Sequence, residues 1–284
     1  MERIGVIGGT GLYLMEGFED VRTEEVVTPF GHPSDPPIVG RLGGVEVVFI
    51  PRHGRGHRFS PSELPYRANV AAMKMLGVTR IFSVSAVGSM KEEIALTVPV
   101  LVDQFIDRTH LRASTFFGDG LVAHVSMADP TCPSLRALLA ARARASAIPF
   151  HEGGTYVCME GPQFSSRAES MMYRQIGVDV IGMTNATEAK LAREAEICYA
   201  TIALPTDYDC WHTGHEDVSV GSVVERLDAG TSRAKALILD ALAHLGEAAP
   251  CGCRDAADGA IITARDRITP AARERLMPIA GRHL

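Results

Sequence analysis

The sequence predicts an α/β protein in which helices flank a mixed or largely parallel β-sheet, and two observations carry this prediction. Short runs rich in β-branched residues alternate with longer stretches of helical periodicity over most of the 284 residues. Several of the short runs are apolar at nearly every position, as expected of strands that are buried on both faces. Strands are expected at Ile4–Ile7, Val45–Ile50, Arg80–Val84, Val98–Asp103, Gly154–Met159, Val178–Met183 and Tyr199–Leu204.

The stretches between these runs carry apolar residues at helical spacing. The first follows Pro61 and places Leu64, Ala68 and Met75 on one side, and the longest ends before Gly246, a residue type that commonly terminates helices. Helices are expected at Ser62–Leu76, Pro133–Ala147, Thr187–Ala195, Ser222–Leu245 and Thr269–Leu276.

The chain is expected to form one domain with a short appendage. No Gly/Ser-rich linker, charge block or internal repeat divides it. Gly, Ala, Pro and Cys crowd together only at Gly246–Gly252. We therefore expect a catalytic domain at residues 1–246 and a tail at residues 247–284 that is not an independent domain.

Composition narrows the class of protein. Hydrophobic residues make up 46% of the chain, which is enough to fill a sizeable core. The formal net charge of −6 argues against a general binder of nucleic acids or acidic membranes, which would need a basic surface. There is no apolar run of membrane-spanning length and no signal-peptide pattern, and six cysteines are too few for a disulfide scaffold. These features predict a cytoplasmic protein.

Polar residues and glycines follow the predicted strands. Because ligands of open α/β sheets bind beyond the carboxyl ends of the strands, these loops could meet at one site. The loops are Gly8–Gly11, Pro51–His57, Ser85–Ser89, Thr184-Asn185 and Pro205–Asp209.

The loop residues fall into two chemical groups. Asp207 and Asp209 offer carboxylates, which suit amino groups or a ring nitrogen that becomes protonated. The other group offers cationic or hydroxyl donors beside glycines, which suits phosphate; it comprises Thr10, Arg52, His53, Ser85 and Thr184. Each piece alone also has a plainer interpretation, namely a tight turn at Gly8–Gly11, a solvated loop at Arg52-His53 and a local cap at Asp207 and Asp209.

Several separated motifs make the sequence similar to a known family. They are Gly8-Gly9-Thr10-Gly11, Pro51-Arg52-His53-Gly54, Asp103–Thr109, Glu160–Glu169 and Thr206–Trp211. On these motifs the chain resembles the methylthioadenosine phosphorylases of the trimeric purine nucleoside phosphorylase family, from residue 4 to about residue 240. The tail with Cys251-Gly252-Cys253 also resembles that of bacterial and archaeal members.

The resemblance implies a single α/β domain with a mixed, partly barrel-like central sheet. It also implies phosphate-dependent cleavage of methylthioadenosine to adenine and 5-methylthioribose 1-phosphate. The expected assembly is a homotrimer or a hexamer, with no metal or organic cofactor, and the expected partners are a nucleoside and phosphate.

The resemblance also assigns residues to parts of the site. Asp207 and Asp209 would face N7 and the 6-amino group of adenine, and His124 would reach a neighbouring subunit's pocket. The implied phosphate site consists of Thr10, Arg52, His53, Ser85, Ala86 and Thr184. The remaining substrate contacts implied are His57, Val87, Gly88, Phe164, Ser165, Met183, Val220, Val223 and Val224.

The chemistry of these roles is consistent. Cleavage of N9–C1′ builds positive charge on the ribose and negative charge on the purine, so a proton given to N7 by Asp207 would assist departure. Burial and the neighbouring Asp209 should therefore raise the pKa of Asp207. A carboxylate at Asp209 prefers a 6-amino over a 6-oxo group, and family members that prefer 6-oxopurines carry Asn at the first of the two positions.

Two rival functions remain open, a phosphorylase of 6-oxopurine nucleosides or methylthioinosine and a non-catalytic purine- or phosphate-binding protein. The histidines beside Cys210 do not supply an orderly set of metal ligands. Cys251-Gly252-Cys253 has the wrong spacing for a usual zinc knuckle, and reduced thiols, a redox-active pair or pairing with another cysteine all remain open.

Overall fold

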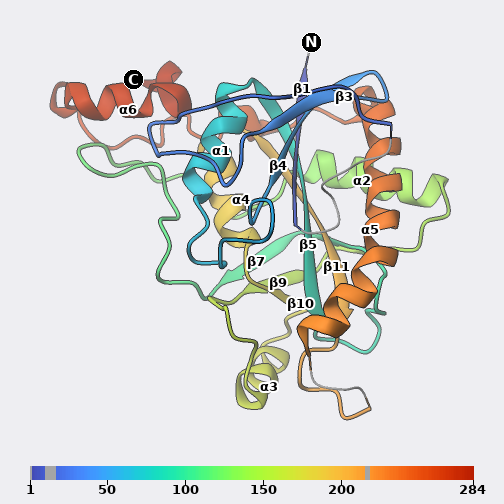
Figure 1. Cartoon of the computed structure of the whole chain (residues 1–284). Coiled ribbons are helices and arrows are strands. Elements are labelled where there is room, and N and C mark those ends of the chain that lie inside the picture. The colour runs from blue at the N-terminus through green and yellow to red at the C-terminus, as the bar shows by residue number, and fades with distance from the viewer. Residues whose placement is uncertain (1, 10–16, 215–217) are drawn as a thin grey trace.

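The protein has a mixed β-sheet flanked by helices in a computed structural model that describes residues 2–9, 17–214 and 218–284 (Figure 1). Within these ranges the strands form one 11-stranded sheet, with a main path β2-β3-β4-β1-β5-β10-β9-β7 and a branch from β5 through β11 and β6 to β8. The predicted α/β class and mixed sheet are confirmed, and the described sheet does not close into a barrel. The strands are β1 Arg3–Gly8, β2 Glu19–Thr23, β3 Ile38–Leu42, β4 Val45–Pro51, β5 Val78–Ser89, β6 Val100–Val102, β7 Gln104–Asp107, β8 His151–Glu152, β9 Thr155–Cys158, β10 Val180–Gly182 and β11 Cys198–Asp207.

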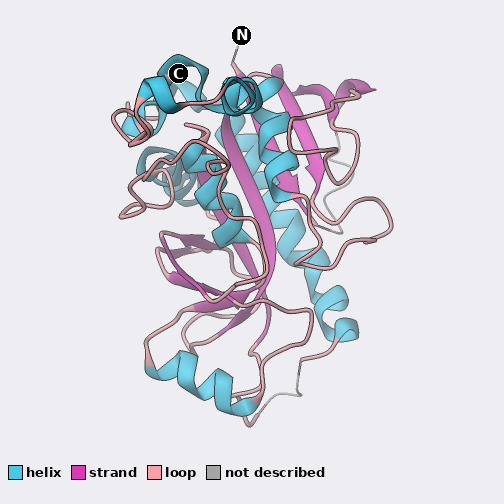
Figure 2. Ribbon diagram, turned by 90° about the vertical axis from the view of Figure 1, so that its left-hand side faces the viewer, coloured by secondary structure: helices cyan, strands magenta, loops and turns pink. Residues whose placement is uncertain are grey.

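Helices cover both faces of the sheet, as Figures 1 and 2 show. They are α1 Tyr66–Met75, α2 Pro133–Ala145, α3 Arg167–Gln175, α4 Asn185–Glu194, α5 Val220–Ala243 and α6 Pro270–Ala280. Helices α2 and α5 pack on one face of β1, β4, β5 and β11, while α1, α4 and α6 pack on the other.

Alternation along the central strands explains their almost continuous apolar sequence. In β4, Val47 and Phe49 join the core beneath α2 and α5, whereas Val48 and Ile50 join the core beneath α1 and α4. Successive side chains of a strand point to opposite faces, so a strand covered on both sides needs apolar residues at every position.

The long strand β5 positions the site because it connects two parts of the sheet. Its first part pairs in parallel with β1 and β11, and its last residues, Gly88 and Ser89, pair antiparallel with β10. The carboxyl ends of β4, β5 and β11 therefore lie near the end of β10.

The structure contains strands and a helix that were not predicted, and some predicted elements have other bounds. The expected strand Val98–Asp103 is shorter, and a separate strand β7 follows Asp103. Strand β2 is exposed throughout and has a polar sequence, so periodicity gives no signal for it. Helix α3 is also missing from the prediction, although Ser166 and Glu169 form a capping box at its start. Strands β3 and β8 are the remaining additions.

The tail lies against the end of the sheet where β1 begins, close to the N-terminal end of the chain (Figure 1). Ile268, Leu276 and Ile279 enter the core beneath α1 and α4. Arg282 forms an ion pair with the buried Glu196, which precedes β11, and Nε2 of His283 lies 2.9 Å from the same carboxylate. In the described part of the chain no helix has the length and apolar character needed to cross a membrane.

Candidate active site

A cavity of about 810 Å³ lies at the carboxyl ends of β4, β5, β10 and β11. Thr184, the residue before α4, the first turns of α5 and the loops after β4 and β9 complete its wall. This volume is of the size that a drug-sized small molecule occupies. Described residues of all five predicted loops line this cavity, although Ser85–Ser89 and Pro205–Asp207 belong to the ends of strands β5 and β11 and are not loops.

Arg52 follows β4 and is almost fully buried at the cavity, with 2% of its surface exposed. Its Nε donates to Oε1 of Glu188 at 2.5 Å, and its terminal nitrogens donate to the Val84 carbonyl at 2.9 Å and the Ser83 hydroxyl at 2.7 Å. Burial alone would lower the pKa of Arg52, but the charge of Glu188 outweighs it and raises that pKa above the usual range. The guanidinium is therefore charged, and its charge is balanced inside the protein.

Glu188 belongs to a buried polar network under the cavity. Its Oε2 accepts hydrogen bonds from the Ser83 hydroxyl at 2.7 Å and from the Tyr199 hydroxyl at 2.8 Å. Asn185 donates from Nδ2 to the same Tyr199 hydroxyl at 2.7 Å. Burial would raise the pKa of Glu188, but Arg52 and the hydroxyl donors hold it below its ordinary value. The network fixes both the ionisation and the orientation of Arg52.

His53 stands next to Arg52 and is neutral near pH 7. Burial lowers its pKa to about 4, and the adjacent Arg52 acts in the same direction. Its Nδ1 lies 2.9 Å from the Phe59 carbonyl, which can only accept, so Nδ1 carries the proton and Nε2 keeps a lone pair. The ring stacks on His57 with centroids 4.1 Å apart. Gly54, at φ 69°, makes the turn between them, where a Cβ would meet the Ser34 carbonyl oxygen at 2.9 Å.

Thr184 and the start of α4 add donors to the same side of the cavity. Thr184 is the N-cap residue of α4, but its hydroxyl does not cap the helix and has no hydrogen-bond partner among the described residues. The hydroxyl is buried at the cavity wall. A helix N-terminus presents free N–H groups and a partial positive charge, and together with a free hydroxyl it suits an anion.

Asp207 and Asp209 lie on the opposite chemical side of the site, at the end of β11. Oδ1 of Asp207 accepts from the backbone N–H of Asp209 at 2.8 Å, and Oδ2 accepts from the Thr206 hydroxyl at 2.9 Å. Burial raises the pKa of Asp207, in the direction that the sequence predicts. The hydrogen bonds from the Asp209 N–H and the Thr206 hydroxyl act against this rise, and the charge of Asp209 makes a smaller contribution to it. Burial also raises the pKa of Asp209, whose Oδ2 has no hydrogen-bond partner within the described ranges.

Apolar side chains form another part of the wall. Ile181 and Met183 come from the end of β10, and Phe164 comes from the loop that follows β9. Val220, Val223, Val224 and Leu227 share one side of the first turns of α5. Val220 is 71% exposed and Val224 is 55% exposed, so this end of the cavity is open to solvent in a single chain.

Three comparisons place this geometry among known proteins. The family model described as the Phosphorylase superfamily matches residues 3–243. The chain belongs to the phosphorylase superfamily. It is 56% identical to the S-methyl-5'-thioadenosine phosphorylase of Geobacter sulfurreducens over 99% of both chains, and 53% identical to that of Cereibacter sphaeroides over 99% of this chain and 98% of the relative.

Solved structures agree with this membership. The chain is similar to a methylthioadenosine phosphorylase from an antarctic soil metagenomic library, with a TM-score of 0.92, 48% identity and coverage of 97% of this chain and 98% of the other. It is also similar to a mutant adenosine/methylthioadenosine phosphorylase from Schistosoma mansoni in complex with methylthioadenosine, with a TM-score of 0.85, 37% identity and coverage of 91% and 96%. The predicted resemblance to methylthioadenosine phosphorylases is confirmed.

Most residues predicted for the phosphorylase site line the one cavity. Thr10 lies outside the described residues. Ser165 does not line the cavity, and its hydroxyl contacts the Met159 sulfur at 3.7 Å. His124 is exposed and lies away from the cavity of its own chain. The predicted residues that line it are Arg52, His53, His57, Ser85, Ala86, Val87, Gly88, Phe164, Met183, Thr184, Asp207, Asp209, Val220, Val223 and Val224.

The sequence analysis missed the partner that balances Arg52 in this phosphorylase. Glu188 lies on the buried side of α4 between Ala186 and Ala189, both of which are fully packed. A carboxylate among small apolar residues of a core-facing helix is a usable signal, because such a group is rarely buried without a partner. The identity of that partner was not accessible, since Arg52 is 136 residues away in the sequence.

Proposed function

We propose that this protein cleaves methylthioadenosine with phosphate, giving adenine and 5-methylthioribose 1-phosphate. Phosphate attacks C1′ as the N9–C1′ bond breaks, and the purine leaves with a proton at N7. The names of the relatives support this reaction, as does the complex of the Schistosoma mansoni protein with methylthioadenosine. Within the site, the assignment rests on the pair of aspartates. Oδ2 of Asp209 is buried and has no hydrogen-bond partner among the described residues, and the nearby Asp207 has a raised pKa.

At the proposed phosphate site, fixed hydrogen-bond donors surround an arginine whose charge is balanced by a glutamate. The Thr184 hydroxyl and the N-terminus of α4 supply donors, and Arg52 adds a guanidinium held by Glu188. Neutral His53 offers a lone pair at Nε2, which suits the P–OH group of hydrogen phosphate. Donors fixed before the substrate arrives stabilise the charge that develops beneath the ribose without reorganising during the reaction.

At the purine end, the two aspartates differ in role. Asp207 keeps a proton more readily than an ordinary aspartate and can donate it to N7 of the leaving base. Oδ2 of Asp209 can accept a hydrogen bond from the 6-amino group of adenine. A 6-oxo group in that place would leave two acceptors facing each other, so the pair favours adenine.

The sugar's 5′ substituent would meet the valines at the start of α5. An apolar wall of this kind suits a methylthio group, although such walls reject an added hydroxyl by only about 10²-fold. Adenosine is therefore expected to be a slower substrate.

Assembly into a trimer or a hexamer is part of the proposal. Val220 and Val224 are exposed at the open end of the cavity in one chain, and His124 is on the surface. A neighbouring subunit that contributes His124 would cover this end. Light scattering on the purified protein measures the assembly directly, and a monomer that is fully active would contradict this part.

The decisive experiment measures base release from methylthioadenosine, adenosine, methylthioinosine and inosine, each with and without phosphate. We expect phosphate-dependent adenine release, fastest from methylthioadenosine. Faster release from methylthioinosine would favour the 6-oxopurine alternative, release without phosphate would indicate a hydrolase, and tight adenine binding without any turnover would indicate a binding protein.

A matched pair of variants tests the assignment of Asp209. Asp209→Asn replaces an acceptor by an amide of the same shape and should reduce the preference for 6-amino over 6-oxo substrates. Asp228→Asn, on the exposed side of α5 outside the cavity, makes the same chemical change and should leave the preference unaltered.

A further inference from the structure

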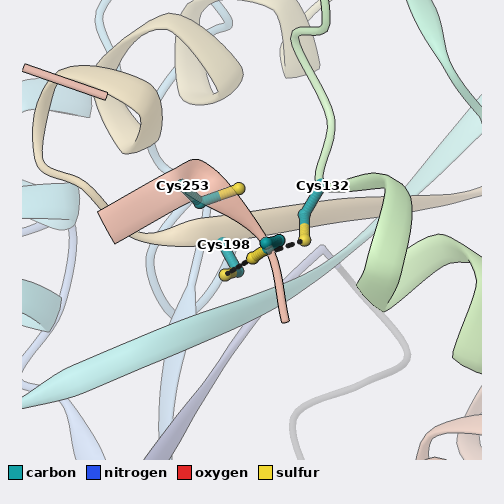
Figure 3. Close-up of side chains that lie close together, drawn as sticks. Cys132, Cys198 and Cys253 are labelled. Atoms are coloured by element: carbon teal, nitrogen blue, oxygen red, sulfur yellow. Dashed lines mark hydrogen bonds between the residues drawn. The ribbon is translucent and has the colours of Figure 1, made fainter. Parts of the chain in front are cut away.

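Four cysteines from three distant parts of the chain meet at the end of the sheet opposite to the cavity. Cys132 immediately precedes α2, Cys198 begins β11, and Cys251 and Cys253 flank Gly252 in the tail. Figure 3 shows Cys132, Cys198 and Cys253 converging from these segments. All four belong to or pack against the core beneath α2 and α5, and Cys251 is the least buried of them.

The four sulfurs lie close enough together to share one ion. All lie within 4.8 Å of one another, with Cys251 Sγ 3.4 Å from Cys198 Sγ and 3.6 Å from Cys132 Sγ. A tetrahedral zinc ion with Zn–S bonds of about 2.3 Å separates its ligands by about 3.8 Å. The observed spacing therefore needs only small side-chain adjustments to accept an ion.

Two donors of positive or partial positive charge lie beside the cluster. The backbone N–H of Leu135, in the first turn of α2, lies 3.4 Å from Cys132 Sγ, and a guanidinium nitrogen of Arg193 lies 3.6 Å from Cys253 Sγ. A helix N-terminus and an arginine together offset the negative charge that four thiolates around one divalent ion carry.

We propose that Cys132, Cys198, Cys251 and Cys253 form a closed tetrathiolate site for a zinc ion that fastens the tail to the sheet. Four soft sulfur ligands in a tetrahedral arrangement suit zinc rather than the hard cations magnesium or calcium. Binding replaces the remaining thiol protons, which pass to solvent, and no atom is oxidised or reduced. With all four positions filled by protein, the ion has no open position for substrate and acts structurally.

The site is remote from the chemistry of the cavity. Cys198 and Asp207 are the two ends of β11, and a ten-residue strand separates its ends by about 30 Å. The ion therefore acts on the attachment of the tail and on resistance to heat, and not on the reaction. Local spacing could not reveal it, because Cys251-Gly252-Cys253 supplies only two ligands and the other two come from 119 and 53 residues away.

The first test measures metal in the full-length protein, purified under reducing conditions without added metal. We expect about one equivalent of zinc per chain, and X-ray absorption should show four sulfur neighbours at about 2.3 Å. Removal of zinc and reloading with cobalt(II) should give the strong visible absorption of tetrahedral cobalt thiolate. These measurements use the wild-type chain, so they do not depend on whether a variant folds.

Variants then assign the ligands. Cys253→Ser and Cys132→Ser should lose at least ten-fold in zinc content or affinity, and their half-life at elevated temperature should fall by a similar factor. Cys158→Ser is the matched control, because Cys158 is a buried free cysteine outside the cluster, and it should retain its zinc. At low temperature the cluster variants should keep phosphorolysis rates within about two-fold of wild type, as a remote site requires.

Three results would overturn the proposal. They are the absence of stoichiometric zinc after reduction and reloading, zinc that persists in both cluster variants, and mass spectrometry showing that these cysteines are joined as disulfides in freshly isolated protein. The substrate panel is independent of all three, so failure of the zinc site leaves the proposed reaction untouched.

Discussion

Replacing Glu188 by Gln should destabilise the protein strongly because it leaves Arg52 charged and without its counterion. Both side chains are almost fully buried, at 2% and 3% side-chain exposure, and they meet at 2.5 Å. Removal of one member of such a buried pair costs about 3–5 kcal/mol, since the other charge remains desolvated. Gln keeps the shape of Glu, so the loss reports charge rather than packing.

The assay is urea unfolding followed by circular dichroism, at fixed protein concentration and without phosphate, because both assembly and ligand shift apparent stability. Glu194→Gln is the matched control: it lies on the same helix, is partly buried and bonds to the Thr115 hydroxyl and the Phe116 N–H instead of an arginine. Burial raises the pKa of Glu194 to about 7, so a neutral amide resembles a form that the protein already populates. We expect a loss below about 1 kcal/mol in the control.

A double-mutant cycle isolates the interaction. Arg52→Met combined with Glu188→Gln should be more stable than the sum of the single losses predicts, by about 2 kcal/mol or more. Phosphate should also stabilise Glu188→Gln more than it stabilises wild type, because the freed guanidinium charge then faces the anion; ten-fold tighter binding corresponds to about 1.4 kcal/mol. If Glu188→Gln loses no more than Glu194→Gln, or if the two substitutions are additive, Arg52 is not held by this ion pair and the reasoning fails.

Three further outcomes follow from the site. Asp207→Asn should lower kcat by about 10²–10⁴-fold while phosphate binding, measured by calorimetry, stays within a few-fold; unchanged turnover would remove Asp207 from the acid role. The pKa of His53 is lowered to about 4 in the folded protein, so the unfolded chain takes up the proton first as pH falls. The free energy of unfolding should therefore fall by about 3 kcal/mol between about pH 6.5 and about pH 4, with no effect of His53 above about pH 6.5. His53→Asn should flatten this part of a stability–pH profile. Gly88→Ala would place a Cβ 2.8 Å from Oδ1 of Asp207, so nucleoside KM should rise by at least ten-fold with little change in phosphate binding, and a KM equal to wild type would show that the aspartate can move at no cost.

Glu188 should also affect how the free energy of unfolding changes at low pH. Its pKa in the folded protein is below the unfolded value of about 4.3, so its contribution is complete above that pH and is lost as pH falls through the folded value. Glu188→Gln should lack this component. The contributions of His53 and Glu188 can be told apart, because that of His53 is lost at higher pH than that of Glu188.

More of the residues that line the cavity than of the smaller strands and helices could be predicted from the sequence, and the reason is physical. Ligand loops at the ends of buried strands carry unusual residues such as Arg52-His53, which stand out against apolar surroundings. Strand β2 has neither an apolar face nor a distinctive turn, so nothing in its sequence indicates a strand. Helix α3 did carry a signal, the Ser166–Glu169 capping box, which belonged to a motif that we interpreted only as family resemblance.

Long-range polar partners lay beyond sequence reasoning for a different reason. Glu188 and Arg52 approach because Arg52 follows β4, a strand of the sheet, and α4 packs against one face of that sheet. The four cysteines approach because the tail returns to the start of β11. Both clusters follow from tertiary packing, in which each partner is unremarkable in its own segment. Residue type and burial on a helix face can indicate that a partner exists, but only the fold supplies it.

The balance of charge at the phosphate end constrains how the proposed reaction can turn over. Arg52 and Glu188 together carry no net charge, and His53 is neutral at pH 7, so we expect the α4 N-terminus, the Thr184 hydroxyl and other oriented dipoles to provide most of the attraction for phosphate. Dipoles act over a shorter range than a free charge, so they stabilise an anion only when it is correctly placed. The same pocket must release a sugar phosphate of equal charge after each cycle. A pocket that binds by position can hold phosphate beneath C1′ in the transition state and still let the product leave, whereas an unbalanced cation would bind both anions tightly and slow the release.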